Sequence, residues 1–246
     1  MPEYVARRLR RTVGRCGPYV VRGSTPVLSF GNAAQAVVAT IGINPSLREF
    51  LDTNGTELTG DARRFETLAS LGTHDLATAP SAVLSRVFDA CNGYFSANPY
   101  RSWFDQLEPI LNHAGASYYD GSACHLDLVQ WATTPVWSKL PKLAREDLMR
   151  QDTEFFREQL AANKYRLLLI NGNGALKRFE AVMGVPVKAV GRITGISAES
   201  RLLEGKLPQG ATVVAWSVNL QSSFGVCKQL RSRLADAVGE LCENHA

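Results

Sequence analysis

The sequence has no hydrophobic run long enough to cross a membrane. Its longest apolar stretches, residues 36–41 and 167–170, have the length of β-strands, whereas a spanning helix needs about 20 apolar residues. The amino terminus is basic, but no apolar segment with a small-residue cleavage site follows its arginines, as a secretion signal would require. We therefore expect a cytoplasmic protein with no membrane partner.

Cysteine is scarce, and its pattern indicates neither a metal site nor a redox pair. The five cysteines are an odd number, are scattered and include no Cys-x-x-Cys pair. We expect reduced, mostly buried thiols that act as small hydrophobic side chains, and we expect no metal ion or other cofactor. The cysteines are Cys16, Cys91, Cys124, Cys227 and Cys242.

No internal repeat, low-complexity tract or flexible linker divides the chain. With 246 residues, 45% of them hydrophobic, the chain is long enough for a core that needs no disulfide or metal. We expect residues 1–246 to form a single domain and to act as a monomer. Residues 1–30 are predicted to be a basic amino-terminal extension or an edge hairpin.

The charge is modest, but it is unevenly distributed. A net charge of +4 does not by itself indicate a nucleic-acid partner. Five arginines nevertheless lie between residues 7 and 15, and further basic residues lie at 63–64 and 228–233. Such clusters occur on solvated charged faces and also along phosphate-binding surfaces. The charge distribution alone does not distinguish a solvated face from a phosphate-binding surface.

Short β-type runs alternate with helix-length segments, which is typical of a mainly parallel sheet covered on both faces. We expect a three-layer α/β/α domain with four strands at residues 36–41, 122–128, 165–170 and 211–217, and an edge hairpin at 19–30. Predicted helices cover residues 61–71, 101–113 with a kink at Pro109, 143–163, 175–182 and 224–242. Ligands of such sheets bind beyond the carboxyl ends of the strands. The loops to inspect are therefore 42–50, 129–137, 171–174 and 218–225.

The first of these loops contains an asparagine between a glycine and a proline. It reads Gly42-Ile43-Asn44-Pro45-Ser46. Gly42 permits close backbone approach and Pro45 fixes the turn, so Asn44 is held in a defined direction. An Asn-Pro turn with Ser46 capping a helix is the structural alternative. The segment resembles the first motif of the mismatch-specific uracil/thymine branch of the uracil-DNA glycosylase superfamily, and this resemblance implies that Asn44 positions the attacking water.

The resemblance recurs in order along most of the chain. Residues 60–65 resemble the segment in which that branch places an aromatic ring near the base pocket, which implies this role for Phe65. Residues 125–129 resemble the strand whose terminal amide reads the pyrimidine edge. Residues 168–172 resemble an apolar strand that ends in a glycine turn, and residues 215–223 resemble the last motif, whose loop inserts into DNA.

Two positions depart from the family pattern. Asn219 stands where many members have histidine, so this site offers an amide instead of an imidazole beside the leaving base. Asp127 stands where uracil-reading members have asparagine. A carboxylate only accepts hydrogen bonds, which suits the N4 amine of cytosine, and a protonated Asp127 would also donate to N3. A strand-end aspartate that caps a turn is the alternative for Asp127.

These features predict a monofunctional DNA glycosylase that flips a modified pyrimidine and leaves an abasic site. The resemblance extends to anti-phage members of the superfamily, so the expected base is a modified cytosine such as glucosylated hydroxymethylcytosine of phage DNA. No lysine stands out for Schiff-base chemistry, and we expect no lyase step. The candidate stacking residues are Phe65, which ranks first, Phe50 and Tyr94, and the alternative for each is a place in the core or the pocket wall. The expected DNA-binding residues are Arg64, Leu220, Gln221, Ser222, Ser223 and Lys228.

Other functions fit parts of the pattern. A uracil or thymine mismatch glycosylase and a nucleoside or nucleotide hydrolase share the expected fold class. An inactive DNA-binding module would be consistent with the missing histidine. Dinucleotide binding would rest on residues 172–174, Gly-Asn-Gly, but these lack the G-x-G-x-x-G spacing and do not follow the first strand.

Overall fold

The computed structural model describes residues 1–196, 198–221 and 226–243. The chain divides into two compact units, each assembled from segments that are far apart in the sequence. The first unit comprises Met1–Asn32, Ile43–Tyr100 and Leu126–Ala162, and the second comprises Ala33–Gly42, Arg101–His125 and Asn163–Ala246. Within the described part of the chain, no helix is both long enough and apolar enough to cross a membrane.

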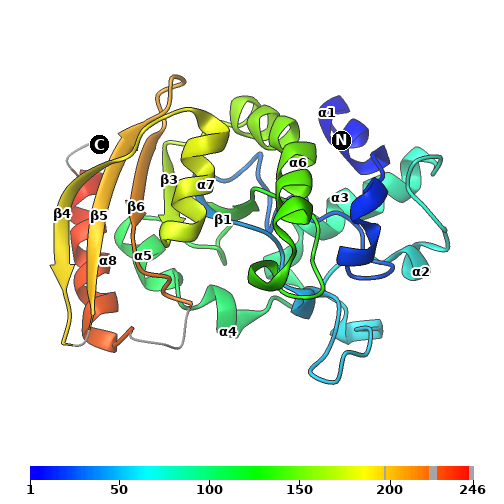
Figure 1. Cartoon of the computed structure of the whole chain (residues 1–246), viewed down its shortest axis with the longest axis horizontal. Helices are drawn as coiled ribbons and strands as arrows, with labels where there is room; N and C mark the ends of the chain where they lie inside the picture. Colours follow the sequence, from blue (N-terminus) through cyan, green and yellow to red (C-terminus); the bar gives the residue numbers. More distant parts are fainter. Residues whose placement is uncertain (197, 222–225, 244–246) are drawn as a thin grey trace. The chain divides into compact units, whose positions relative to one another are not determined.

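A six-stranded mixed, mainly parallel sheet flanked by helices confirms the predicted α/β class (Figure 1). The strand order is β2-β1-β3-β6-β5-β4, and the residues of β2 up to His125 belong to the second unit with the other five strands. Parallel pairing joins β1 to β3 and β3 to β6. The strands are β1 (Val38–Gly42), β2 (Ala123–Asp127), β3 (Leu167–Asn171), β4 (Lys188–Thr194), β5 (Glu199–Lys206) and β6 (Thr212–Trp216).

The four predicted strands are confirmed as β1, β2, β3 and β6, but the prediction of a four-stranded sheet was wrong. Two more strands, β5 and β4, extend it by antiparallel pairing from β6. Most side chains of β4 are exposed, and β5 alternates polar residues with a few buried ones such as Leu202 and Leu203. Neither strand therefore has the continuous apolar run by which the central strands were recognised.

Helices cover both faces of this sheet. Figure 1 shows α7 (Asn173–Met183) in front of the strands and α8 (Lys228–Glu243) behind them. Helix α8 packs against α5 (Glu108–His113), and a Cβ added at Gly239 would lie 3.3 Å from Cβ of His113. The glycine thus permits close helix packing. The predictions of helices at 175–182 and 224–242 are confirmed, although residues 222–225 lie outside the described residues.

The first unit is mostly helical and irregular. Its helices are α1 (Glu3–Arg10), α2 (Leu68–Leu71), α3 (Ser81–Asn92) and α6 (Lys142–Ala162). Helix α6 confirms the prediction for residues 143–163, whereas the sequence analysis did not identify α1 or α3. Residues 19–30 form no hairpin, because they hold only the isolated β-bridge residues Val20, Ser24 and Phe30; Val20 pairs with Thr133 and Ser24 with Thr67.

Two other helix predictions need correction. The prediction for residues 61–71 was wrong over most of its length, because Thr67 and Ser70 form a capping box that starts the short α2 at Leu68. The segment before it holds only a 3-10 turn, Gly60–Ala62. The predicted helix at 101–113 is split into α4 (Arg101–Phe104) and α5, whose first turn contains Pro109.

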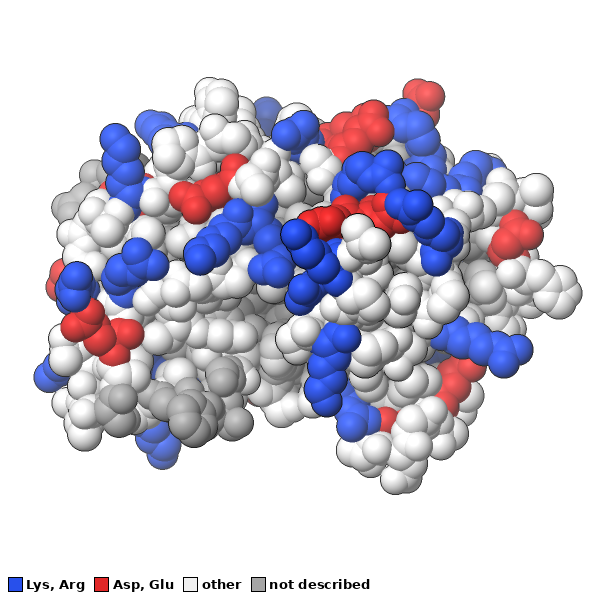
Figure 2. Space-filling view, in the orientation of Figure 1, with Lys and Arg blue, Asp and Glu red and all other residues white. Residues whose placement is uncertain are grey.

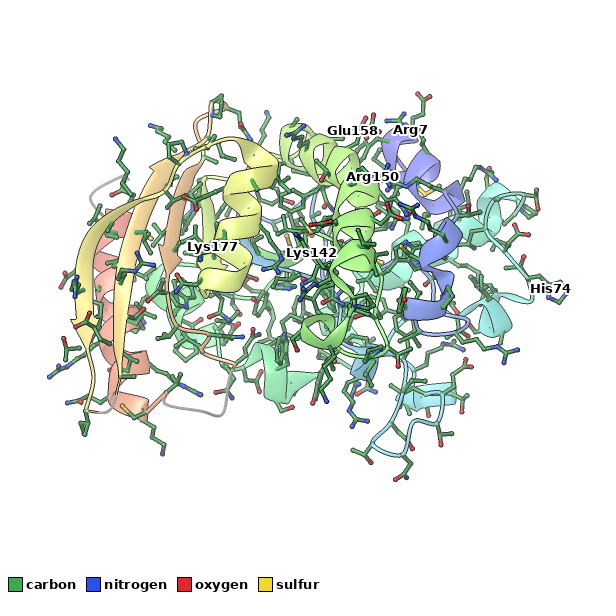
Figure 3. All side chains as sticks on the ribbon, viewed as in Figure 1. Arg7, His74, Lys142, Arg150, Glu158 and Lys177 are labelled. Carbon is green, nitrogen blue, oxygen red and sulfur yellow. The ribbon has the colours of Figure 1, made fainter. Side chains whose placement is uncertain are left out.

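The basic residues of the amino terminus are held by the first unit itself. Buried Asp152 of α6 pairs with Arg8 at 3.0 Å and with Arg11 at 2.7 Å, while Arg7 pairs with Glu158 and Arg15 with Asp147. Arg10 donates to two backbone carbonyls, both at 2.9 Å. Figure 2 shows acidic side chains among the basic ones over this unit, and Figure 3 shows Arg7 beside Glu158. These arginines therefore have intramolecular partners and do not form an unpaired row for phosphates.

Candidate active site

Asn44 lies in the loop that follows β1, and its amide has a fixed orientation. Nδ2 donates to the carbonyl oxygens of Pro45 and Trp131, at 2.9 and 3.3 Å, and to Oγ1 of Thr133 at 3.1 Å. Because two of these partners are carbonyls, which only accept, the amide nitrogen must face them. The opposite atom, Oδ1, accepts from none of the residues that the structure describes. It is the atom that can accept a hydrogen bond from water.

The rest of the Gly42 to Ser46 motif shapes this loop. Gly42 is the last residue of β1, and the backbone oxygen of Ile43 accepts from the backbone nitrogen of Val129 at 2.9 Å. Oγ of Ser46 accepts from the backbone nitrogen of Arg48 at 3.2 Å and caps the 3-10 turn Leu47–Glu49. The capping role of Ser46 and the fixed amide of Asn44 are thus both present in one loop.

The segment after β2 contains Trp131 and Thr133, which accept hydrogen bonds from the Asn44 amide. Asp127, the last residue of β2, is buried, and its backbone oxygen accepts from Nε2 of Gln130 at 2.8 Å. The backbone nitrogen of Gln130 donates to Asp152 at 2.8 Å, and its Oε1 accepts from Arg8 at 3.2 Å. The buried Arg8 and Asp152 therefore brace the segment that carries the acceptors of Asn44.

Glu49 is a buried acid in the same loop that the sequence analysis missed. It is only 1% exposed, and its Oε2 accepts from the hydroxyl of Tyr94 at 2.8 Å. Burial raises the pKa of Glu49 to about 8; the Tyr94 hydroxyl and Arg64 lower it, and the nearby Asp127 raises it. A glutamate after a loop motif is usually solvated, so only its closeness to Asn44 in the sequence could have drawn attention to it.

The three predicted stacking residues lie together as a packed aromatic cluster. The rings of Phe65 and Tyr94 stack with centroids 4.9 Å apart, and Phe50 lies 5.8 Å from Phe65. Phe30 adds edge contacts to both Phe65 and Tyr94. All four are buried. The rings bury one another, and the Tyr94 hydroxyl connects the cluster to Glu49.

Arg64 places a positive charge near Glu49. Its Nε donates to the carbonyl oxygen of Asn98 at 3.2 Å, a second nitrogen donates to the carbonyl of Arg48, and the guanidinium lies 4.9 Å from the ring centre of Tyr100. The partners that hold the guanidinium are neutral carbonyls and a ring face. Among the described residues no carboxylate forms an ion pair with Arg64, although its charge lowers the pKa of Glu49.

The second unit has its own polar cluster where β3 and β6 end. Asn171 uses all four hydrogen-bonding positions of its amide. Its Oδ1 accepts from Nε1 of Trp216 and the backbone nitrogen of Leu220, and its Nδ2 donates to Oδ1 of Asn219 and Oε1 of Gln221, all at 2.8–2.9 Å. Asn171 thus fixes residues 219–221, a role that the sequence did not indicate.

The predicted DNA-binding loop of this unit is described in part. Leu220 is fully buried, so it does not present its side chain for insertion between bases, and Gln221 is held by Asn171 and by the carbonyl of Trp103 at 3.1 Å. Asn219 and Lys228 are exposed. Ser222 and Ser223 lie outside the described residues.

The first unit therefore contains an oriented amide acceptor, a buried carboxyl group with a raised pKa, a second buried carboxyl group and an arginine, which are groups that can orient water and bind polar molecules. Within residues 1–196, 198–221 and 226–243, no group of three or more His, Cys, Asp or Glu side chains lies together as a metal site would require. Comparison of the sequence with protein-family models and with curated proteins found no match.

Proposed function

We propose that the protein is a DNA glycosylase that hydrolyses the N-glycosidic bond of a flipped, modified cytosine. The observation that carries the proposal is the Asn44 amide, whose nitrogen is bound by Pro45, Trp131 and Thr133. An acceptor oxygen held in this way orients a water molecule for attack, and orientation is a large part of catalysis. The proposal includes a three-layer, uracil-DNA glycosylase-like arrangement of the flanked sheet.

The reaction starts from a nucleotide that has left the base stack, because the bond to be broken is inaccessible within a duplex. The water oxygen bonds to C1′ of the sugar while the C1′–N1 bond breaks, and the electron pair of that bond goes to the base. One proton of the water ends on the departing base. Asn44 accepts a hydrogen bond from the water without taking its proton, and the products are an abasic site and a free base.

Asp127 supports cytosine as the parent of the substrate. A buried carboxylate accepts hydrogen bonds, and the exocyclic N4 amine of cytosine donates them. At that position uracil presents O4, which is an acceptor. A carboxylate is also an acceptor, so the two groups would repel each other. Asp127 is therefore assigned to the exocyclic amine. Modification at C5, the position that carries the glucosylated hydroxymethyl group, leaves this edge unchanged.

We assign the contacts with the DNA backbone to three polar residues, Arg64, Asn219 and Lys228. Arg64 has the charge and the fixed geometry for a phosphate. In the second unit, Oδ1 of Asn219 accepts from Asn171, which turns its Nδ2 outward as a donor to DNA. Lys228, exposed at the start of α8, adds a charge contact that salt would weaken.

A base-release assay tests the proposal. Purified protein is incubated with DNA containing uracil, a thymine mismatch, hydroxymethylcytosine or glucosylated hydroxymethylcytosine, and abasic sites are revealed by alkali. We expect strand breaks with modified cytosine, reduced by about 100-fold or more in Asn44→Ala. Asn54→Ala is the matched control, because Asn54 is exposed in the same unit.

Three outcomes would overturn parts of the proposal. Release from no DNA of the panel would remove the glycosylase function, and tight binding without release would indicate a binding module. Release from uracil alone would leave the enzyme class but remove the cytosine assignment. Unchanged release by Asn44→Ala, with an unchanged melting temperature, would remove the role of Asn44.

A further inference from the structure

Strands β4 and β5 place two arginines next to each other on one face of the sheet. Arg192 of β4 and Arg201 of β5 are directly opposite in the antiparallel ladder, so their side chains lie on the same face. Like charges in such a pair repel each other. Glu199 forms an ion pair with Arg192 at 3.0 Å, whereas among the described residues no carboxylate forms an ion pair with Arg201. The positive charge of Arg201 is therefore not balanced by a carboxylate partner.

A neutral amide holds the Arg201 guanidinium instead. Its Nη2 donates to Oδ1 of Asn173, the first residue of α7, at 3.1 Å. Lys177, labelled in Figure 3, lies one turn further along α7 on the same side of the helix as Asn173. Arg201 and Lys177 are both exposed, and Lys177 also forms no ion pair with a carboxylate of the described residues. Two positive charges thus lie around Asn173 on a surface that a ligand can reach.

Asn219 adds an uncharged donor to the same part of the second unit. A Cβ added at Gly172, the residue before Asn173, would lie 3.2 Å from Cβ of Asn219, so the two segments are in close contact. Oδ1 of Asn219 accepts from Nδ2 of Asn171 at 2.9 Å and from the backbone nitrogen of Gln221 at 3.0 Å. Because this oxygen faces its two donors and the side chain is exposed, Nδ2 points away from them as a donor.

We propose that Arg201, Lys177 and Asn219 form a phosphate-binding patch, and that its ligand is a phosphate group of the DNA backbone. The outward-facing atoms of all three side chains are N–H donors, and an arginine fork can bind two phosphate oxygens at once. Arg201 is the main contact, because Asn173 already fixes its orientation. A phosphate contact fixes the position of the strand and does not read the base sequence. The choice of DNA as the source of the phosphate rests on the proposed function.

The test measures binding of a short unmodified DNA duplex by wild type and three variants at salt concentrations between about 50 and 200 mM. Arg201→Gln should weaken binding about tenfold at the lowest salt and reduce the slope of log affinity against log salt by about 1. Arg201→Lys keeps the charge and should keep the slope. Lys206→Gln is the matched control and should match wild type, because Lys206 is exposed at the other end of β5, opposite Thr212 at the start of β6.

The outcomes separate this inference from the proposed function, because binding of unmodified DNA is measured without base release. Equal affinity and slope in Arg201→Gln and Lys206→Gln would overturn the inference and leave the proposed function intact. A reduced slope in Arg201→Gln, in a protein that releases no base from any DNA, would support the patch and remove only the glycosylase function.

Calorimetric titration with inorganic phosphate separates the two sources of the ligand. We expect no saturation of wild type at a Kd below about 1 mM, because a single free phosphate lacks the rest of the DNA strand. Saturation below that value in wild type, lost in Arg201→Gln and kept in Lys206→Gln, would overturn DNA as the ligand of the patch.

Discussion

Nδ2 of Asn44 lies 3.1 Å from Oγ1 of Thr133, a buried residue in the segment that follows β2. The hydroxyl completes a set of three acceptors around one amide nitrogen, two of them backbone carbonyls. The direction of the Asn44 oxygen therefore depends on a residue distant in the sequence. Thr133 is a positioning residue for the proposed water site.

Replacing Thr133 by valine tests this relationship, because valine keeps the shape of the side chain and removes the acceptor. We expect kcat for base release to fall by about tenfold with little change in KM, which corresponds to the loss of one hydrogen bond. Thr153→Val is the control, since the Thr153 hydroxyl donates to the carbonyl of Met149 within α6. Equal activity of Thr133→Val and wild type would show that the carbonyls alone hold the amide.

The pKa of Glu49 also predicts how stability depends on pH. Its pKa is about 8 in the folded protein and near 4.5 in the unfolded chain, so the folded state holds a proton that unfolding releases. Its contribution to stability is complete below about pH 4.5 and is lost as pH rises through 8, with a slope of up to about 1.4 kcal/mol per pH unit.

Glu49→Gln removes this titration. The free energy of unfolding of the variant minus that of wild type should become more positive between pH 5 and 8, as measured by urea unfolding at several pH values. Glu154→Gln should show a constant difference across the same range. A constant difference for Glu49→Gln as well would mean that Glu49 is ionised in the folded protein.

The sequence alone predicted those strands whose residue pattern allows a single interpretation. The apolar runs that became β1, β3 and β6 are buried strands with no competing interpretation. The Gly42 to Ser46 motif indicated a turn at Asn44, but two of the three contacts that orient its amide come from Trp131 and Thr133, which the motif could not show. Strands β4 and β5 gave no such signal, because they lie at the end of the sheet and polar residues interrupt their apolar ones. Their pairing is set by β6, which is a tertiary effect.

The site residues that the sequence missed all depend on long-range contacts. Glu49 is unusual only because Tyr94 and the surrounding cluster bury it, and Asn171 is important only because Trp216, Leu220 and Asn219 converge on its amide. The arginines near the amino terminus show the converse. They are adjacent in the sequence and suggested a charged surface, but α6 supplies their acidic partners.

Asn171→Ala should destabilise the second unit and loosen the loop that it fixes. The substitution leaves Nε1 of Trp216 and the backbone nitrogen of Leu220 without their acceptor, at a cost of about 2–4 kcal/mol in the free energy of unfolding. Hydrogen exchange at the Leu220 amide should accelerate more than exchange in α7. Asn173→Ala, which removes only an exposed bond to Arg201, should cost less than about 1 kcal/mol. Equal effects of the two substitutions would contradict the bracing role of Asn171.

The buried pair of Arg8 and Asp152 predicts a large and specific loss of stability. Asp152 accepts from Arg11 and from the backbone of Gln130 and pairs with Arg8, whose side chain is only 1% exposed. Asp152→Ala leaves a buried guanidinium without a counter-charge, so we expect a loss of about 3–5 kcal/mol. Glu158→Ala removes the half-buried partner of the exposed Arg7 and should cost less than about 1 kcal/mol. In the double variant Arg8→Met/Asp152→Ala the charge is gone, and part of the loss should be recovered in urea unfolding. A double variant as unstable as the sum of the two single variants would show that Arg8 and Asp152 stabilise the unit independently.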